Sequence, residues 1–167
     1  MKLQAHGIET DLPPGWEGRI ALRTAPGAAA RSSAEPASRA LGTEGEVPNP
    51  VVHLANFALP EQRGDFGSGA VDVMTEADVL VVLVEYGPDA VGQALFKRKG
   101  IPTDLAPNMF SGSALQRTIS GQAGCQVFFT VEDRAFCCYT VLGRQSAANR
   151  VLPQANATLA ATRITRR

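Results

Sequence analysis

The feature that most constrains the fold of this chain is one uninterrupted apolar run, Val79-Leu80-Val81-Val82-Leu83-Val84. The run ends at Glu85 and Tyr86. A strand with one wet face alternates apolar and polar residues, whereas a strand covered on both faces stays apolar throughout. We therefore expect a central strand at 79–86, and helical elements covering the second side of its sheet.

Neighbouring strands are indicated by tight turns. His6-Gly7 separates residues 2–5 from residues 8–12, where apolar and acidic side chains alternate, so a hairpin is expected there. Glu132-Asp133 is expected to form a second tight turn. It lies within a predicted β-meander with strands at 114–119, 125–131 and 134–142. Two more strands are predicted, at 16–24 and 50–58.

One helix stands out near the end of the chain. Residues 146–161 place Ala148, Leu152, Ala155 and Leu159 at helical spacing, and a short strand is expected at 161–165. Shorter helices are expected after Ser68, which would be the cap, and over 88–98.

The chain of 167 residues has the length of a single domain. The predicted fold class is α+β: a mostly antiparallel sheet covered by the long C-terminal helix and by short helices. Residues 25–48 are rich in Ala, Ser, Gly, Pro and Glu and have no aromatic residue. They are expected to form a flexible loop or arm within the domain at 1–167.

Charge and hydropathy exclude several classes of partner. The 16 basic residues balance the 16 acidic ones, so no net basic charge favours nucleic acid, and no apolar run of membrane-spanning length is present. The first residues lack the apolar segment of a secretory signal, and the odd number of cysteines suits free thiols. These features predict a cytoplasmic protein, with export as the alternative if a signal was removed. Arg strongly outnumbers Lys, which is typical of GC-rich bacteria.

Linear motifs of catalysis are missing from the sequence. It has two histidines, no Gly-x-Ser-x-Gly elbow, no Cys-x-x-Cys and no phosphate-binding glycine loop. We therefore expect no enzymatic activity, no cofactor and no metal. Three residues are singled out as possible ligand or partner contacts: Trp16, Glu85 and Tyr139. Glu85 ends the most buried predicted strand, and the two aromatic residues could line an apolar pocket.

The segment Gly7-Ile8-Glu9-Thr10-Asp11-Leu12-Pro13-Pro14-Gly15-Trp16 resembles an opening found in the PsbP and DcrB-like superfamily. There, too, a strand leads through a Pro-x-Gly-Trp turn into a second strand, and a meander, a helix and a short strand close the domain. The resemblance implies an α/β/α sandwich without an enzymatic site. Members are mostly accessory or binding proteins, such as photosystem extrinsic subunits, a regulator of a small GTPase and envelope lipoproteins.

Three functions remain open at this point, of which an enzyme with an unfamiliar site is the third and has no linear motif in its favour. The first is a non-catalytic accessory or interaction protein that binds a protein partner, or a second copy of itself, through a sheet face or the 25–48 arm. The second is a small-molecule-binding domain with an apolar pocket between sheet and helix, lined by residues such as Trp16, Phe128 and Tyr139.

Overall fold

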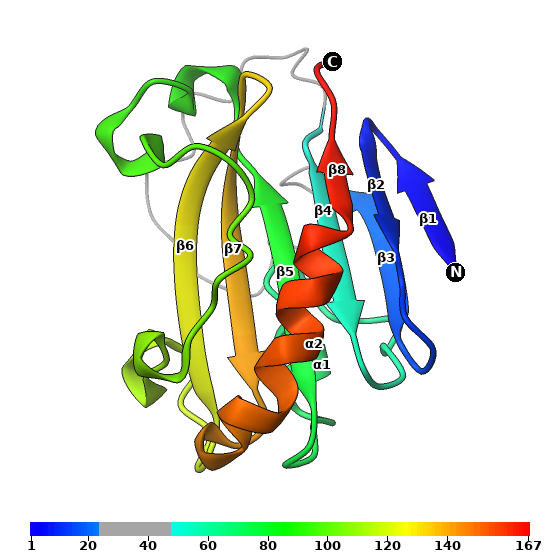
Figure 1. The fold of residues 1–167 in the computed structure, drawn as a ribbon, viewed down its shortest axis with the longest axis vertical. Coiled ribbons are helices and arrows are strands. Elements are labelled where there is room, and N and C mark those ends of the chain that lie inside the picture. The colour runs from blue at the N-terminus through cyan, green and yellow to red at the C-terminus, as the bar shows by residue number, and fades with distance from the viewer. Residues whose placement is uncertain (24–47) are drawn as a thin grey trace, which may run out of the picture.

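The computed structural model describes residues 1–23 and 48–167 (Figure 1). Apart from Pro48, the loop or arm expected at 25–48 lies outside these residues. The strands are β1 (Lys2–Ala5), β2 (Ile8–Asp11), β3 (Glu17–Leu22), β4 (Pro50–Ala55), β5 (Val79–Glu85), β6 (Ala123–Val131), β7 (Arg134–Leu142) and β8 (Thr162–Ile164). The α-helices are α1 (Ser68–Val71) and α2 (Ala148–Ala160), and the 3₁₀ helices are η1 (Pro88–Ala90), η2 (Ala94–Phe96), η3 (Pro107–Met109), η4 (Gly112–Ala114) and η5 (Gln145–Ala147).

The described strands form two antiparallel sheets where the sequence predicted one. A five-stranded sheet has the order β3-β4-β5-β7-β6, and a three-stranded sheet has the order β1-β2-β8. The α+β fold class with mostly antiparallel strands is confirmed. The chain passes from the small sheet to the large one at Pro13-Pro14-Gly15, where Gly15 has φ +81° and Trp16 N–H donates to the Pro13 carbonyl. The chain changes direction at this turn, and β2 and β3 therefore belong to different sheets.

Strand β5 is the middle strand of the large sheet, as predicted. It pairs with β4 on one side and with β7 on the other, and every residue from Val79 to Glu85 is buried. Strand β7 is buried along its whole length as well. The two tight turns are also confirmed, since His6, Gly7, Glu132 and Asp133 all have positive φ, as two-residue hairpin turns require.

The long helix α2 and the small sheet together cover one face of the large sheet. Figure 1 shows α2 crossing in front of the large sheet and continuing directly into β8. Side chains of α2, such as Leu152 and Leu159, share a core with Val81 of β5 and Ile8 of β2. The predicted helix at 146–161 and the final strand are thus confirmed, with η5 preceding α2. Within the described ranges, no helix combines the length and apolar character needed to cross a membrane.

The opposite face of the large sheet is covered mainly by loops. Its core includes Val82 and Tyr139, against which Phe57, Phe66 and Leu115 pack. The only described α-helix on this face is α1, which has four residues, so the expected helical cover is limited to one turn.

The N-cap of α1 is Gly67 rather than Ser68. Gly67 has φ +74°, and a Cβ at this position would lie 2.6 Å from Leu80 Cδ2. Only glycine therefore fits where the chain meets β5, and Ser68 becomes the first residue of the helix.

Two other elements differ from the prediction. Residues 114–119 form no strand, because η4 ends at Ala114 and the Gln116 N–H donates to the Tyr139 hydroxyl instead of a ladder partner. The predicted meander is therefore the single hairpin β6–β7. The helix predicted over 88–98 is two 3₁₀ helices, η1 and η2, separated at Gly92, whose φ of +89° no α-helix allows.

Candidate functional site

A pocket of about 260 Å³ opens where β5 ends and β7 begins. We call it the charged pocket, and its lining is Asn49, Glu85, Tyr86, Pro88, Val91, Glu132, Asp133, Arg134, Ala135, Arg166 and Arg167. These residues come from the segment before β4, the end of β5, η1 and the residue after it, the β6–β7 turn, the start of β7, and the segment after β8. Chain segments far apart in the sequence therefore form one site.

The floor of the charged pocket is a buried ion pair. Arg134 Nε donates to Glu85 Oε1 at 3.0 Å and Arg134 Nη2 donates to Glu85 Oε2 at 2.6 Å, and each side chain is 4% exposed. This is the two-bond geometry in which a guanidinium best compensates a buried carboxylate for its lost hydration.

The same arginine also joins the two sheets. Arg134 Nη1 donates to the Thr165 carbonyl at 3.0 Å and to the Gly7 carbonyl at 3.4 Å. Gly7 follows β1 and Thr165 follows β8, so a side chain of the large sheet is anchored on the small one. A Cβ at Gly7 would lie 2.9 Å from Arg134 Nη1, and the absent side chain leaves room for this approach.

Strand register explains why Glu85 and Arg134 meet. Glu85 lies opposite Phe136 in the β5–β7 ladder, and alternation places both side chains on the face that packs against the small sheet. Arg134 is two residues before Phe136, hence on the same face, and its guanidinium carbon lies 5.3 Å from the Phe136 ring centroid. The ion pair thus follows from the pairing of β5 with β7.

Two further arginines form the rim of the charged pocket. Arg167 Nη2 donates to Glu85 Oε2 at 3.0 Å, and Arg166 Nη2 lies 2.6 Å from Asp133 Oδ2. The Arg166 and Asp133 side chains are 69% and 68% exposed, so this pair contributes little to stability. This exposed ion pair can therefore break at a small cost in free energy when a charged group of a partner binds.

One wall of the charged pocket is aromatic. The ring of Tyr86 packs 5.2 Å from that of Phe96 and 6.4 Å from that of Phe128, and the Arg23 guanidinium carbon lies 5.6 Å from the Tyr86 centroid. Burial raises the pKa of Tyr86. Together with Val91, this wall gives the pocket an apolar side above a charged floor.

The three residues predicted as contacts are placed apart. Glu85 lies in the floor of the charged pocket, but Trp16 is 6% exposed and belongs to the core that also contains side chains of α2. Tyr139 lies on the opposite face of the large sheet. The predicted lining by Trp16, Phe128 and Tyr139 is therefore not brought together. The cavity beside Tyr139 measures about 20 Å³, which is room for a single water molecule.

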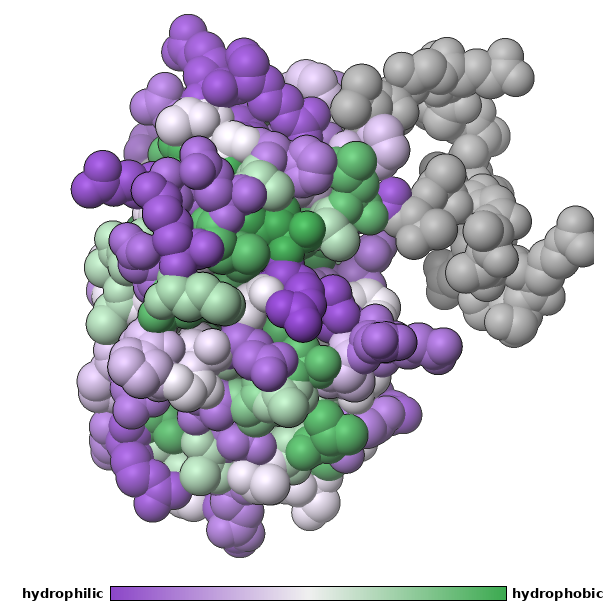
Figure 2. Space-filling model, turned by 90° about the vertical axis from the view of Figure 1, so that its right-hand side faces the viewer, coloured by the Kyte–Doolittle hydropathy of each residue, from purple (hydrophilic) through white to green (hydrophobic). Residues whose placement is uncertain are grey.

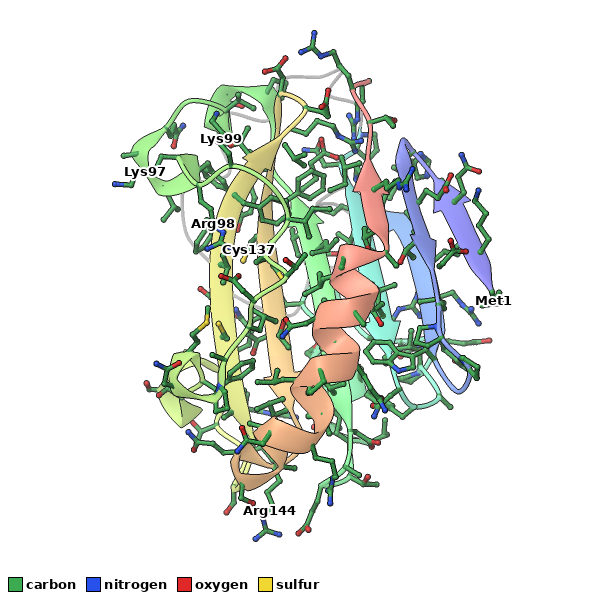
Figure 3. All side chains as sticks on the ribbon, in the orientation of Figure 1. Met1, Lys97, Arg98, Lys99, Cys137 and Arg144 are labelled. Carbon is green, nitrogen blue, oxygen red and sulfur yellow. The ribbon has the colours of Figure 1, made fainter. Side chains whose placement is uncertain are left out.

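Sequence reasoning missed the arginines of this site. Arg134 begins the strand predicted at 134–142, and Arg166 and Arg167 follow the short strand expected at 161–165. A signal was available: Glu85 ends one apolar strand and Arg134 begins another, and buried charges must be paired. The basic side chains of residues 97–99 are exposed (Figure 3). Arg98 pairs with Asp104 at 2.9 Å.

The three cysteines are buried free thiols, as predicted. Cys137 and Cys138 point to opposite faces of β7, one into each core. Cys137 lies well inside the molecule (Figure 3). Burial raises the pKa of both thiols to about 12, with neighbouring thiols adding to the effect.

We expect the native thiols to resist Ellman's reagent. With a pKa of about 12 for Cys137 and Cys138, the thiolate fraction at pH 8 is on the order of 10³-fold below that of a free cysteine. Absorbance at 412 nm should therefore rise slowly in buffer and rapidly in 8 M urea, where all three cysteines should react. Rapid reaction of two thiols without denaturant would contradict the buried arrangement.

Metal ligands do not gather in the described ranges, where no group of three or more His, Cys, Asp or Glu side chains is placed to hold an ion. Comparison of the chain with models of protein families, with curated proteins and with solved structures found no match.

Proposed function

We propose that this chain is a non-catalytic accessory or interaction protein that binds a protein partner through the charged pocket. The observation that supports this proposal is the small volume of the pocket. Its volume of about 260 Å³ is below the roughly 300–1,000 Å³ of pockets that enclose a whole small ligand, yet it suits one anchoring side chain.

The lining suggests what kind of side chain would anchor there. Tyr86 and Val91 offer apolar contact, while Arg166, Arg167 and Asp133 offer exchangeable ion pairs at the rim. A side chain with an apolar stem and a polar or charged end would satisfy both. Figure 2 shows hydrophobic patches between hydrophilic residues on the side of the molecule that lies at the right of Figure 1.

The PsbP-like α/β/α sandwich is a further part of this proposal. The helix-covered face and the Pro-Pro-Gly-Trp turn support it, while the small second sheet and the loop-covered face are additions to that plan. A bacterial origin and a cytoplasmic location stay predictions from the sequence. The second candidate function, a small-molecule-binding domain, would use the charged pocket rather than the space beneath α2.

Selection of peptides from a random phage-displayed library tests the proposal. We expect enriched peptides to bind the wild-type chain and to lose at least about tenfold in affinity for a Val91→Trp variant, because the indole would fill the pocket. Fluorescence anisotropy with labelled peptides measures this difference.

The matched control is Leu95→Trp, which adds the same indole at a side chain that is 58% exposed and outside the pocket lining. Peptides that bind the wild-type, Val91→Trp and Leu95→Trp chains equally well would contradict the proposal. The small-molecule alternative would be favoured by two results together. Small-molecule fragments would stabilise the wild-type and Leu95→Trp chains but not Val91→Trp, and no selected peptide would lose affinity for Val91→Trp.

A further inference from the structure

The two arginines that follow β8 are held to the charged pocket by their side chains alone. The Thr165 N–H donates to a carbonyl of the β1–β2 turn at 2.8 Å, and in the described part of the chain no backbone hydrogen bond extends beyond Thr165. Arg166 and Arg167 lie past this point, where Figure 1 shows the chain leaving the small sheet. Their side chains instead form the ion pairs with Asp133 and Glu85.

Arg134, the third arginine of the pocket, is fixed in place. Its side chain is 4% exposed and donates twice to Glu85 and also to two backbone carbonyls beside the small sheet. The side chains of Arg166 and Arg167 are 69% and 41% exposed. Glu85 keeps both bonds to Arg134 when Arg167 leaves, so the two outer arginines can depart without loss of the pocket floor.

Departure of the two outer arginines would leave the charged pocket with an excess of negative charge. The lining holds the carboxylates of Glu85, Glu132 and Asp133, and Arg134 would be the single lining cation that opposes them. Among the described residues, Glu132 forms no ion pair. A pocket of this charge favours a cationic group of a partner.

The shape of the pocket favours an arginine side chain over a small cation. Arg167 already shows the geometry, because its Nη2 atom donates at 3.0 Å to a Glu85 side chain that is only 4% exposed. Tyr86 and Val91 give the pocket an apolar side, against which the methylene groups of an arginine would pack. Arg23, which contacts the Tyr86 ring, is not part of the lining.

On the basis of the function proposed above, we propose that the partner inserts an arginine side chain into the charged pocket, and that Arg166 and Arg167 occupy this place in the free chain. A guanidinium group pairs with carboxylates through parallel charge-assisted hydrogen bonds, which a lysine ammonium does not form. The partner's arginine and the outer arginines compete for the carboxylates of Glu85 and Asp133. The apparent affinity for the partner is therefore reduced in proportion to the fraction of molecules in which the pocket is open.

A short arginine peptide tests this competition by fluorescence anisotropy. The probe is fluorescein-labelled Gly-Ser-Arg-Arg-Ser-Gly, titrated with the full chain in about 150 mM salt, which screens non-specific attraction between charges. The Arg166→Ala/Arg167→Ala variant should bind the probe at least about tenfold more tightly than the wild-type chain, because the internal competitor is gone. The same peptide with glutamine in place of arginine should bind neither chain.

Two further variants separate the pocket from the overall charge of the chain. Arg144→Ala/Arg150→Ala also removes two exposed arginines, one just before α2 and one in its first turn. Arg144 lies at the end of the molecule opposite to the last residues of the chain (Figure 1, Figure 3), so this variant should bind the probe as the wild-type chain does. Adding Glu132→Gln and Asp133→Asn to the variant that lacks the outer arginines should remove the gain, since both substitutions keep the side-chain size and remove the charge. Thermal unfolding checks that each variant is folded.

Equal affinity of the arginine peptide for the wild-type chain and for Arg166→Ala/Arg167→Ala would overturn the proposed competition, and so would an equal gain in Arg144→Ala/Arg150→Ala. A gain that survives removal of the two carboxylates of the β6–β7 turn would also overturn it. The phage selection gives a separate answer for the function proposed above. Selected peptides that depend on Val91 and contain no arginine would leave that function in place and would exclude arginine as the anchor.

Discussion

Replacing Arg134 with alanine should lower the free energy of unfolding by about 3–5 kcal/mol. Glu85, which is 3% exposed in the wild-type structure, loses its two-bond partner, and a buried carboxylate without a compensating charge is strongly unfavourable. It also removes the bonds from Nη1 to Gly7 and Thr165, which hold the small sheet to the large one. Arg167 still reaches Glu85, but from an exposed position that compensates only in part.

Urea unfolding followed by tryptophan fluorescence measures this effect, because Trp16 is the only tryptophan and is buried in the core. Arg166→Ala is the matched control: it removes an exposed arginine from the Asp133 pair and should cost under about 1 kcal/mol. The double variant Glu85→Met/Arg134→Met should recover most of the loss, since apolar residues of similar size leave no charge unpaired. An Arg134→Ala variant as stable as Arg166→Ala would refute the structural role of the pair.

Acid should destabilise the chain through His53. Its pKa is about 4 in the folded state, lowered from 6.5 first by burial and then by Arg63. The unfolded chain therefore binds more protons than the folded chain between these two values. The contribution of His53 to the free energy of unfolding is fully present above pH 6.5 and decreases as the pH falls. Below pH 4 this residue alone lowers the free energy of unfolding by about 3 kcal/mol.

The measurement is the free energy of unfolding in urea between pH 7.5 and pH 4.5, compared with a His53→Gln variant. Glutamine does not titrate, so the variant should lose less stability over this range than the wild-type chain, whatever its stability at pH 7.5. His6→Asn controls for removal of a histidine, because His6 is exposed and asparagine accepts its φ of +52°. Equal pH dependence of the wild-type chain and His53→Gln would exclude a titration of the buried ring.

Much of the fold could be predicted because the evidence was local. The apolar run at 79–84 identified the middle strand, since only a strand covered on both faces has no polar side to show. The two hairpins followed from dipeptides that accept positive φ, and α2 followed from apolar residues at helical spacing. In each case the deciding residues are within a few positions of one another.

Elements without such local evidence were misjudged. Residues 114–119 have strand-forming composition but contribute a backbone N–H to the Tyr139 hydroxyl, a partner 23 positions away. The division into two sheets depends on the pairing of β8 with β2, two strands at opposite ends of the chain. No short sequence pattern predicts this pairing. Strand formation requires a partner strand, and the partner is chosen by the whole chain.

By itself, the sequence determined the middle strand, the two hairpin turns and the long helix, because local periodicity and backbone preference decide these. Only the tertiary structure decided which polar groups meet. Strand register brings Glu85 and Arg134 together, and the large sheet separates Trp16 from Tyr139. A binding site requires residues that are far apart in the chain to lie close together, and the packing of the folded chain decides which residues do so.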